Sequence, residues 1–295
     1  VLPNQHGTAP GLIIPIPERV GAWVVMLPGP PRELQPMFLD QVLPWLEREA
    51  PPVEPYVEQL LRSIDVPESV MQERVEPILA PWLDRGLEVG YCARPGEVDV
   101  RLSARGRDAR RLVDEAASAV MAALGDSFYG REEETIEAVV VRLLTRRGCT
   151  LATAESCTGG LLATRITDIP GASVVFRGGV VAYSNDAKQT LLGVREESLA
   201  AHGAVSEAVA REMAMGVRER LGADYAVATT GIAGPSGGTP EKPVGTVYIA
   251  VAGPRGIEVR RRINAFGRAG FKQLTTSQAL EWLRQTVLQD DAPSA

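Results

Sequence analysis

The sequence predicts an α/β protein that ends in a layered α/β domain with a mixed sheet. Three observations support this fold class: helical and extended patterns alternate throughout residues 131–295, a β-hairpin flanked by helices fills residues 53–128, and Pro51-Pro52 breaks the chain before it. A chain of 295 residues is long enough for two or three domains. We therefore expect a partial α/β domain at 1–50, a small α+β domain at 53–128 and the layered domain at 131–295.

Residues 1–50 contain two apolar runs and one helical pattern. The runs at 11–16 and 23–27 predict strands, and apolar spacing across 32–49 predicts a helix that starts near Pro31. A strand, a Gly/Pro-rich loop and a helix in this order can present an anion site at the helix N-terminus. Because the chain begins with Val1 and no Met, we expect this first domain to be incomplete.

Residues 53–128 combine helices at 69–83 and 109–124 with strands at 87–92 and 98–103. The pattern is similar to that of RNA-binding KH units, but the Gly-x-x-Gly loop with which such units hold a nucleic-acid backbone is absent. A structural spacer or a dimerisation module is the alternative.

Residues 131–295 alternate between the hydrophobic period of a helix and that of a strand. We expect helices at 135–147, 161–169, 186–192, 206–221 and 271–288, and strands at 149–154, 174–181, 225–230, 244–252 and 257–264. Ser206 and Gly222 are placed to cap the helix at 206–221. Gly178-Gly179 inside a strand predicts a bulge or a close approach of backbone.

Composition excludes several classes of function. A net charge of −6 and a pI of about 5.2 argue against a general nucleic-acid binder, and no apolar run approaches the length of a membrane helix. Three cysteines without a CxxC pair fit reduced thiols in the cytoplasm, and only two histidines make a His-rich zinc site unexpected. The chemistry must therefore use Ser, Lys, Tyr, Thr, Arg, carboxylates or backbone groups.

Lysine is rare in this chain, since only Lys188, Lys242 and Lys272 occur among 31 basic residues. Lysine at 188 therefore suggests a need that arginine does not meet: a buried ammonium can lose its proton and act as a base, whereas a guanidinium stays charged. The alternative is an ordinary solvated lysine. The partner we expect is Ser156, which makes a Ser/Lys hydrolase site.

Ser156 follows a predicted strand and opens a glycine-rich helix start. The helix dipole favours negative charge there, and free N–H groups near Gly159 and Gly160 could hold a developing oxyanion. A serine that merely caps the helix is the alternative. Cys157 is a rival nucleophile, although no histidine lies near it in the sequence to activate it.

Three further segments follow strands and could reach the same site. Ser156 and Lys188 both lie on loops at strand ends, which converge in α/β domains. Tyr183 could relay a proton or simply pack its ring. The glycine-dense loop 229–238 suits a phosphate or a carboxamide, or is a lid, and Arg268 is either an anion clamp or a surface charge.

Together these segments resemble one family, the C-terminal domain of CinA, a competence/damage-inducible protein, over about 134–288. The motifs are AESCTGG at 154–160, YSNDAK at 183–188, HGAVS at 202–206, TGIAGP at 230–235 and KPVGTV at 242–247. Residues 1–50, with LPNQHGTAPG and PGPPRE, look like the tail of the CinA N-terminal domain, which is similar to molybdopterin-binding folds. Residues 53–128 are similar to its KH-like middle domain.

The resemblance implies hydrolysis of the carboxamide of nicotinamide mononucleotide, a small-molecule nucleotide, by a cytoplasmic homodimer that needs no metal or other cofactor and binds neither nucleic acid nor membrane. It assigns Ser156 as nucleophile, Lys188 as base and Tyr183 as helper. It assigns substrate or oxyanion contacts to Thr230 and Gly231 and makes Arg268 a substrate ligand, beside the contacts that we expect from the amides near Gly159 and Gly160. The alternatives are a metal-dependent ADP-ribose pyrophosphatase of the N-terminal domain, which would take a divalent metal, and a nucleotide-binding module without turnover.

Overall fold

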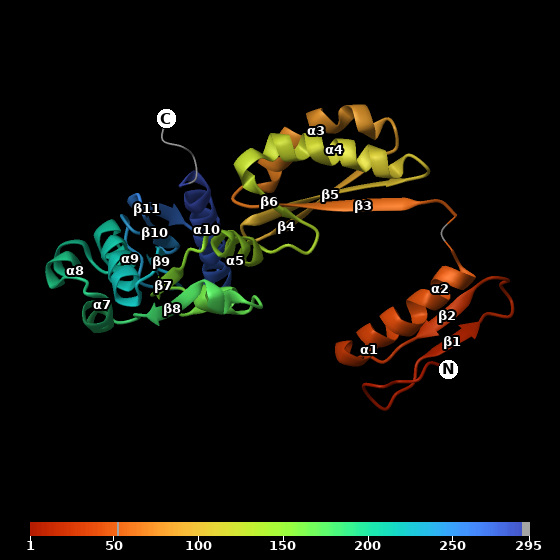
Figure 1. The fold of residues 1–295 in the computed structure, drawn as a ribbon, viewed down its shortest axis with the longest axis horizontal. Coiled ribbons are helices and arrows are strands. Elements are labelled where there is room, and N and C mark those ends of the chain that lie inside the picture. The colour runs from red at the N-terminus through yellow and green to blue at the C-terminus, as the bar shows by residue number, and fades with distance from the viewer. Residues whose placement is uncertain (52, 291–295) are drawn as a thin grey trace. The chain divides into compact units, whose positions relative to one another are not determined.

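The computed structural model describes residues 1–51 and 53–290. The chain forms two compact units: one contains Val1–Tyr56 and Arg105–Arg107, and the other contains Val57–Ala104 and the chain from Asp108 onward (Figure 1). None of the helices in the described ranges combines the length and the apolar character that a bilayer span requires.

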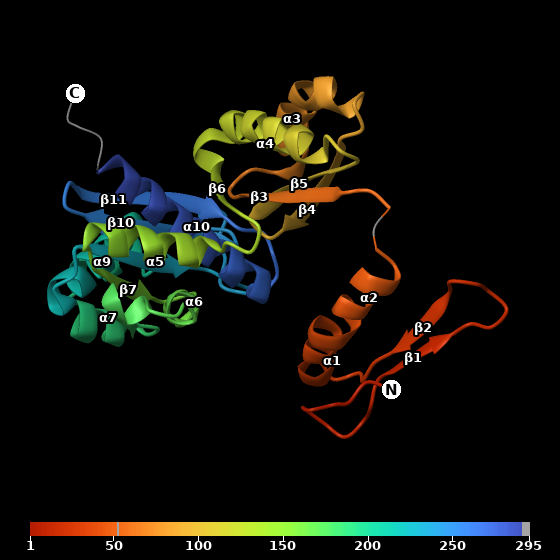
Figure 2. The same cartoon turned by 45° about the vertical axis from the view of Figure 1, so that its right-hand side comes forward.

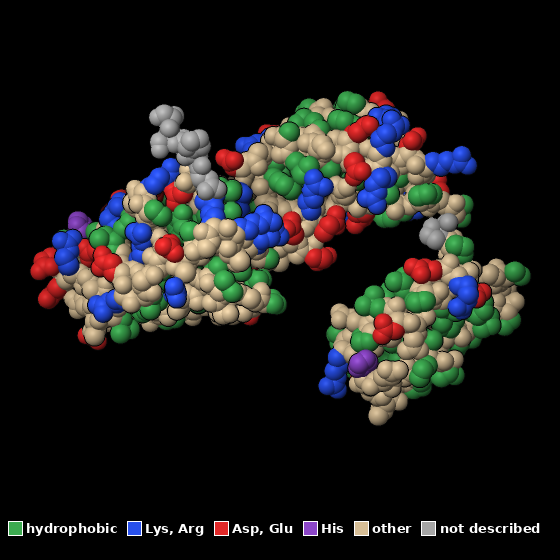
Figure 3. All heavy atoms as spheres, in the orientation of Figure 1, with side chains coloured by type: hydrophobic (Ala, Val, Ile, Leu, Met, Phe, Trp, Pro, Cys, Tyr) green, Lys and Arg blue, Asp and Glu red, His purple; other side chains and the backbone are tan. Residues whose placement is uncertain are grey.

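The first unit is a two-stranded sheet beside a long helical segment. Strand β1 (Leu12–Pro15) pairs antiparallel with β2 (Trp23–Met26). The predicted helix is present, but it passes from α1 (Pro31–Met37) through a π-helical stretch (Phe38–Val42) into α2 (Leu43–Glu49). Apolar side chains are spread over the surface of this unit in Figure 3, and the exposed ones include Ile14, Trp23, Met26, Phe38 and Leu39.

The second unit begins with a four-stranded sheet of order β4-β5-β3-β6 and two helices that share its apolar core. The predicted elements are α3 (Glu68–Leu83), β4 (Glu88–Arg94), β5 (Glu97–Arg105) and α4 (Ala109–Leu124). Two strands were not expected from the sequence, namely β3 (Tyr56–Ser63) and β6 (Phe128–Arg131).

The rest of the unit is a layered α/β fold around a mixed five-stranded sheet of order β11-β10-β9-β7-β8, as the sequence predicts. Strands β7, β8 and β9 are parallel, and β10 and β11 are antiparallel to their neighbours. The strands are β7 (Leu151–Glu155), β8 (Phe176–Val181), β9 (Tyr225–Gly231), β10 (Thr246–Gly253) and β11 (Gly256–Ile263).

Helices cover both faces of this sheet (Figure 2). One core contains α5 (Ile136–Arg147), α6 (Leu161–Thr167) and α10 (Arg268–Gln289), packed on large side chains such as Val227 and Ile249. The other core contains α9 (Glu207–Leu221), packed on small strand residues. These are alanines on three neighbouring strands: Ala152, Ala154, Ala226, Ala228, Ala250 and Ala252. Alternation of large and small residues thus fixes which helix approaches which face.

Helix α7 (Asn185–Leu192), which carries Lys188, lies close against α9. Gly216 of α9 makes this possible, because a Cβ atom there would overlap the carbonyl oxygen of Leu192. A short helix that was not predicted, α8 (Glu196–His202), connects α7 to α9. Contact between two backbones therefore sets the position of the helix that bears the candidate base.

We predict that Gly216→Ala destabilises the protein by about 1–3 kcal/mol through overpacking. Helix propensity alone predicts the opposite sign, because Ala is favoured over Gly inside a helix by about 1 kcal/mol. Urea unfolding gives the answer, with the exposed neighbour Met215→Ala as the control that changes propensity without close packing. A stabilised Gly216→Ala variant would show that α7 and α9 are not in tight contact.

Candidate active site

A cavity of about 330 Å³ lies where the parallel strands of the five-stranded sheet end. The loops after such strands converge, as the sequence analysis expects. Six predicted residues line this cavity: Ser156, Tyr183, Lys188, Thr230, Gly231 and Arg268. Their approach is produced by the fold, since they come from four separate segments of the chain.

Lys188 is almost fully buried, with an exposed fraction of 1%. Its Nζ donates hydrogen bonds to the carbonyl oxygens of Ala182 (3.0 Å) and Tyr183 (3.2 Å), and it forms no ion pair with a carboxylate among the described residues. Burial lowers the pKa of Lys188 from its usual value, and the nearby Cys157 thiol opposes that shift. A neutral amine has two N–H groups and one lone pair, so these two carbonyls can occupy both hydrogens and leave the lone pair free.

Ser156 is the first residue after β7, and it is also buried. Its backbone N–H donates to the carbonyl of Thr229 at 2.9 Å, which fixes the nucleophile loop to the end of β9. Within the described residues no hydrogen bond joins the Ser156 hydroxyl to Lys188. The structure places the two groups in one cavity, and the proton transfer between them remains a prediction.

Glu155 shapes the nucleophile loop, and sequence reasoning missed it. Its carboxylate is 1% exposed and accepts three backbone N–H groups at the start of α6, from Gly160 (2.9 Å), Leu162 (3.0 Å) and Ala163 (2.8 Å). It thus occupies the positive end of this helix, where we expected the oxyanion. The signal in the sequence was an acidic residue between a buried strand and a glycine-rich helix start.

The expectation that the amides of Gly159 and Gly160 are free to hold an oxyanion is therefore wrong in this structure. The Gly160 amide donates to Glu155, the Gly159 amide donates to the carbonyl of Ser156 (3.2 Å), and neither residue lines the cavity. Both amides already have acceptors, so neither is free to stabilise an oxyanion. Their positive φ angles of 63° and 93° show instead that the loop needs glycine for its turn.

Cys157 lines the cavity, but its thiol is poorly suited to act as the nucleophile. Burial, the largest effect, raises the pKa of Cys157 to about 12. The thiol consequently stays protonated at neutral pH, and the thiolate is the reactive form. Ser156 is left as the better candidate.

Tyr183 and Arg268 meet at the exposed side of the cavity. Arg268 Nη2 donates to the Tyr183 hydroxyl at 2.8 Å, and its Nη1 donates to the carbonyl of Gly234 at 3.1 Å. The Tyr183 side chain is 62% exposed, so its phenol is directed toward Arg268 and the solvent. Tyr183 contacts Lys188 through its backbone carbonyl, which is a different contribution from the proton relay that the sequence suggested.

The segment after α8 forms another wall of the cavity, through Ala204 and Val205. The Thr230 hydroxyl donates to the carbonyl of Ala204 at 2.8 Å, and Lys242 Nζ donates to the carbonyl of His202 at 2.7 Å. Thr230 thus holds this wall in place, although the sequence suggested direct contact with substrate. Gly231 also lines the cavity. A Cβ atom at this position would lie 2.7 Å from the Thr246 carbonyl oxygen of β10, so a larger residue would crowd that strand.

Comparison with known proteins identifies the family. The CinA C-terminal domain model matches residues 133–287, and the model of the damage-inducible protein CinA KH domain matches residues 58–130. A competence-damage inducible protein of Thermoanaerobacter pseudethanolicus is 41% identical over 291 residues, which cover 98% of this chain and 68% of the relative. A CinA-like protein of Desulfovibrio desulfuricans is 44% identical and covers 96% of this chain, with 66% of its own length matched.

Solved structures agree with this result. The competence/damage inducible protein CihA from Agrobacterium tumefaciens is similar at 43% identity with a TM-score of 0.51, over 52% of this chain and 94% of that one. A CinA superfamily protein from Klebsiella pneumoniae is similar at 38% identity with the same TM-score, over 52% and 96%. The chain belongs to the CinA family, which confirms the resemblance inferred from its motifs.

The alternative pyrophosphatase activity would need a site for a divalent metal. Across 1–51 and 53–290 no group of three or more His, Cys, Asp or Glu side chains is arranged to hold a metal ion. The pyrophosphatase stays an untested alternative.

We predict that Glu155→Ala lowers the free energy of unfolding by about 2–4 kcal/mol, because three N–H groups at the start of α6 lose their acceptor. Glu155→Gln keeps an amide oxygen that can accept two of these bonds, so its loss should be about 1 kcal/mol. Chemical denaturation of both variants measures the difference. Equal stability of Glu155→Ala and the parent protein would show that Glu155 does not stabilise the start of α6.

Proposed function

We propose that this cavity hydrolyses the carboxamide of nicotinamide mononucleotide to nicotinate mononucleotide and ammonia. Lys188 carries the proposal, because it is buried, has no carboxylate partner among the described residues and lines the same cavity as Ser156, which is what a Ser/Lys acyl transfer needs. In the first step neutral Lys188 takes the proton of Ser156, whose oxygen attacks the carboxamide carbon. The C–N bond then breaks, ammonia leaves with that proton, and water hydrolyses the resulting ester of Ser156.

The oxyanion of the tetrahedral intermediate needs donors other than Gly159 and Gly160. We assign one to the amide of Cys157, because this residue directly follows the nucleophile and lines the cavity, and its N–H donates to no backbone carbonyl within the described residues. A donor of this kind is worth about 3 kcal/mol in the transition state. Arg268 has N–H groups beyond the two used by Tyr183 and Gly234, and these can bind an anionic part of the substrate.

Release of ammonia from nicotinamide mononucleotide tests the proposal directly, and Lys188→Arg is the decisive variant. Arginine keeps a positive charge but cannot act as a base, so we expect turnover to fall by about 10²–10⁴-fold. Ammonia release by the parent protein should be unchanged in EDTA, whereas a pyrophosphatase would need metal to form AMP from ADP-ribose. Full activity of Lys188→Arg would refute the base role.

The pH dependence of the parent enzyme gives a second prediction. Because burial lowers the pKa of Lys188, the neutral and catalytically competent amine appears at a lower pH than for a free lysine. We expect kcat/KM to rise with pH along a limb whose midpoint lies below the ordinary lysine value. A rate that falls across this range, or a midpoint at the value of a free lysine, contradicts an uncharged Lys188.

A further inference from the structure

Lys272 lies beside the nucleophile loop, and the proposed mechanism does not use it. It follows Arg268 by one turn of α10, and its Nζ lies 3.6 Å from the position that a Cβ atom would occupy at Gly159. Within the described residues its Nζ makes no hydrogen bond and no ion pair. Residues four apart share one face of a helix, so Arg268 and Lys272 point to the same side of α10.

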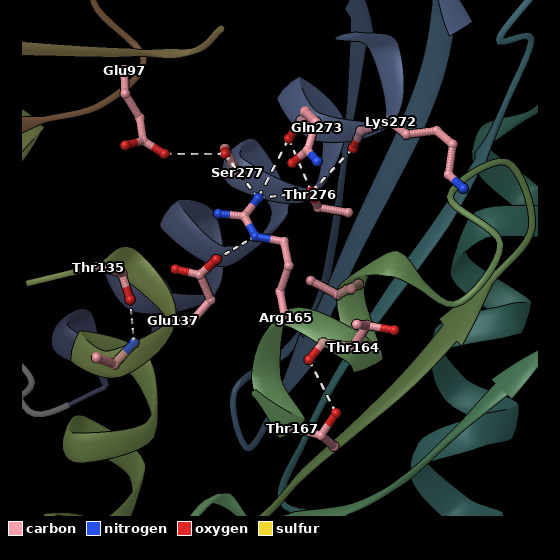
Figure 4. Close-up of polar contacts among 12 residues, drawn as sticks. Glu97, Thr135, Glu137, Thr164, Arg165, Thr167, Lys272, Gln273, Thr276 and Ser277 are labelled. Atoms are coloured by element: carbon pink, nitrogen blue, oxygen red, sulfur yellow. Dashed lines mark hydrogen bonds and ion pairs between the residues drawn. The ribbon is translucent and has the colours of Figure 1, made fainter. Parts of the chain in front are cut away.

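The part of α10 that carries Lys272 is held in place by contacts with α6. Arg165 of α6 donates to Thr276 (2.8 Å) and Ser277 (2.9 Å) of α10, and pairs with Glu137 of α5. Figure 4 shows Lys272 extending away from this cluster. Because α6 directly follows the Ser156–Gly160 loop, these contacts fix the position of α10 relative to that loop.

The two cations at the start of α10 lack carboxylate partners among the described residues. The first turn of α10 contains no acidic residue, and neither Arg268 nor Lys272 pairs with a carboxylate among the described residues. Cations are disfavoured near the positive end of a helix, and two of them one turn apart repel each other. A bound dianion would relieve both effects, because it adds negative charge between the two side chains and the helix start.

We propose that Lys272, together with Arg268, binds the phosphate of a mononucleotide, and so selects a phosphorylated substrate over the corresponding nucleoside. This rests on the proposed amidase function, in which the carboxamide must reach Ser156. A cavity of about 330 Å³ is at the small end for ligand sites, so the phosphate of a mononucleotide would lie outside the part that holds its base. The exposed Gly159 keeps the space in front of Lys272 free of a side chain.

The test compares two substrates that differ only in the phosphate, nicotinamide mononucleotide and nicotinamide riboside. For Lys272→Met we expect KM for the mononucleotide to rise about 10- to 100-fold, the range for a lost hydrogen bond to a charged group. The kcat for the mononucleotide and both constants for the riboside should stay unchanged. Lys272→Arg should restore KM to within a few-fold, and Arg146→Met, an exposed cation on α5, controls for net charge.

Equal effects of Lys272→Met on both substrates, or no effect on the mononucleotide, would overturn the inference. If the parent protein releases ammonia from neither substrate, the proposed function fails, and calorimetric titration with nicotinamide mononucleotide decides the phosphate site separately. Weaker binding to Lys272→Met than to the parent then supports the site. Undiminished binding to Lys272→Met, or no binding to the parent, rejects it.

Discussion

A buried amine whose hydrogen-bond partners, among the described residues, are two carbonyl oxygens sets the main constraint on this domain. Placing an ammonium in such surroundings is costly, and the cost falls when the group is neutral. The chain meets this demand with backbone geometry: the two residues after β8, Ala182 and Tyr183, supply the carbonyls, and Gly216 lets α7, the helix that carries Lys188, pack closely on α9. The same burial that favours the neutral form of Lys188, which can accept a proton, also keeps the Cys157 thiol protonated. Of the two possible nucleophiles, Ser156 and Cys157, this environment disfavours the cysteine.

Sequence periodicity predicted the elements whose apolar faces are regular. Helix α9 is the clearest case, because Ser206 caps its start and Gly222 ends it in the left-handed conformation, as expected. Strand β3 was missed because it buries Gln59, Arg62 and Ser63, which a hydrophobic pattern does not mark as core residues. These polar groups are paired across the fold, for example Arg62 with Asp99 at 2.7 Å, and such pairings are invisible in a single sequence.

The sequence analysis missed short elements for a different reason. Strand β6 has four residues, and α8 has seven and buries only Ser198. Segments of this length do not complete enough periods to stand out from loops, and their stability comes from tertiary contacts. The predicted irregularity at Gly178-Gly179 was confirmed, since the register of β7 and β8 shifts between Leu151 and Ala152, where Ala152 pairs with Gly178.

The residues that line the candidate site could be predicted more readily than the hydrogen bonds among them. Convergence of strand ends is a rule of α/β topology, so Ser156, Lys188 and Arg268 could be expected in one place. Side chains such as Glu155 decide which amides remain free. Its carboxylate oxygens accept hydrogen bonds from amides five to eight residues later in the chain. The usual capping box links positions only three apart, so sequence spacing gave no warning that the Gly160 amide was already used.

The three lysines illustrate how far composition can go. In the proposed mechanism Lys188 is the lysine that loses a proton, and arginine could not replace it there because a guanidinium stays charged. Lys242 and Lys272 differ, because each reaches a glycine-containing loop next to the cavity, and Nζ lies 3.9 Å and 3.6 Å from where Cβ atoms would stand at Gly203 and Gly159. A compact ammonium fits against such backbone more easily than a planar guanidinium. In a chain that otherwise uses arginine, a lysine therefore marks the neighbourhood of the cavity, and its role there follows from its contacts.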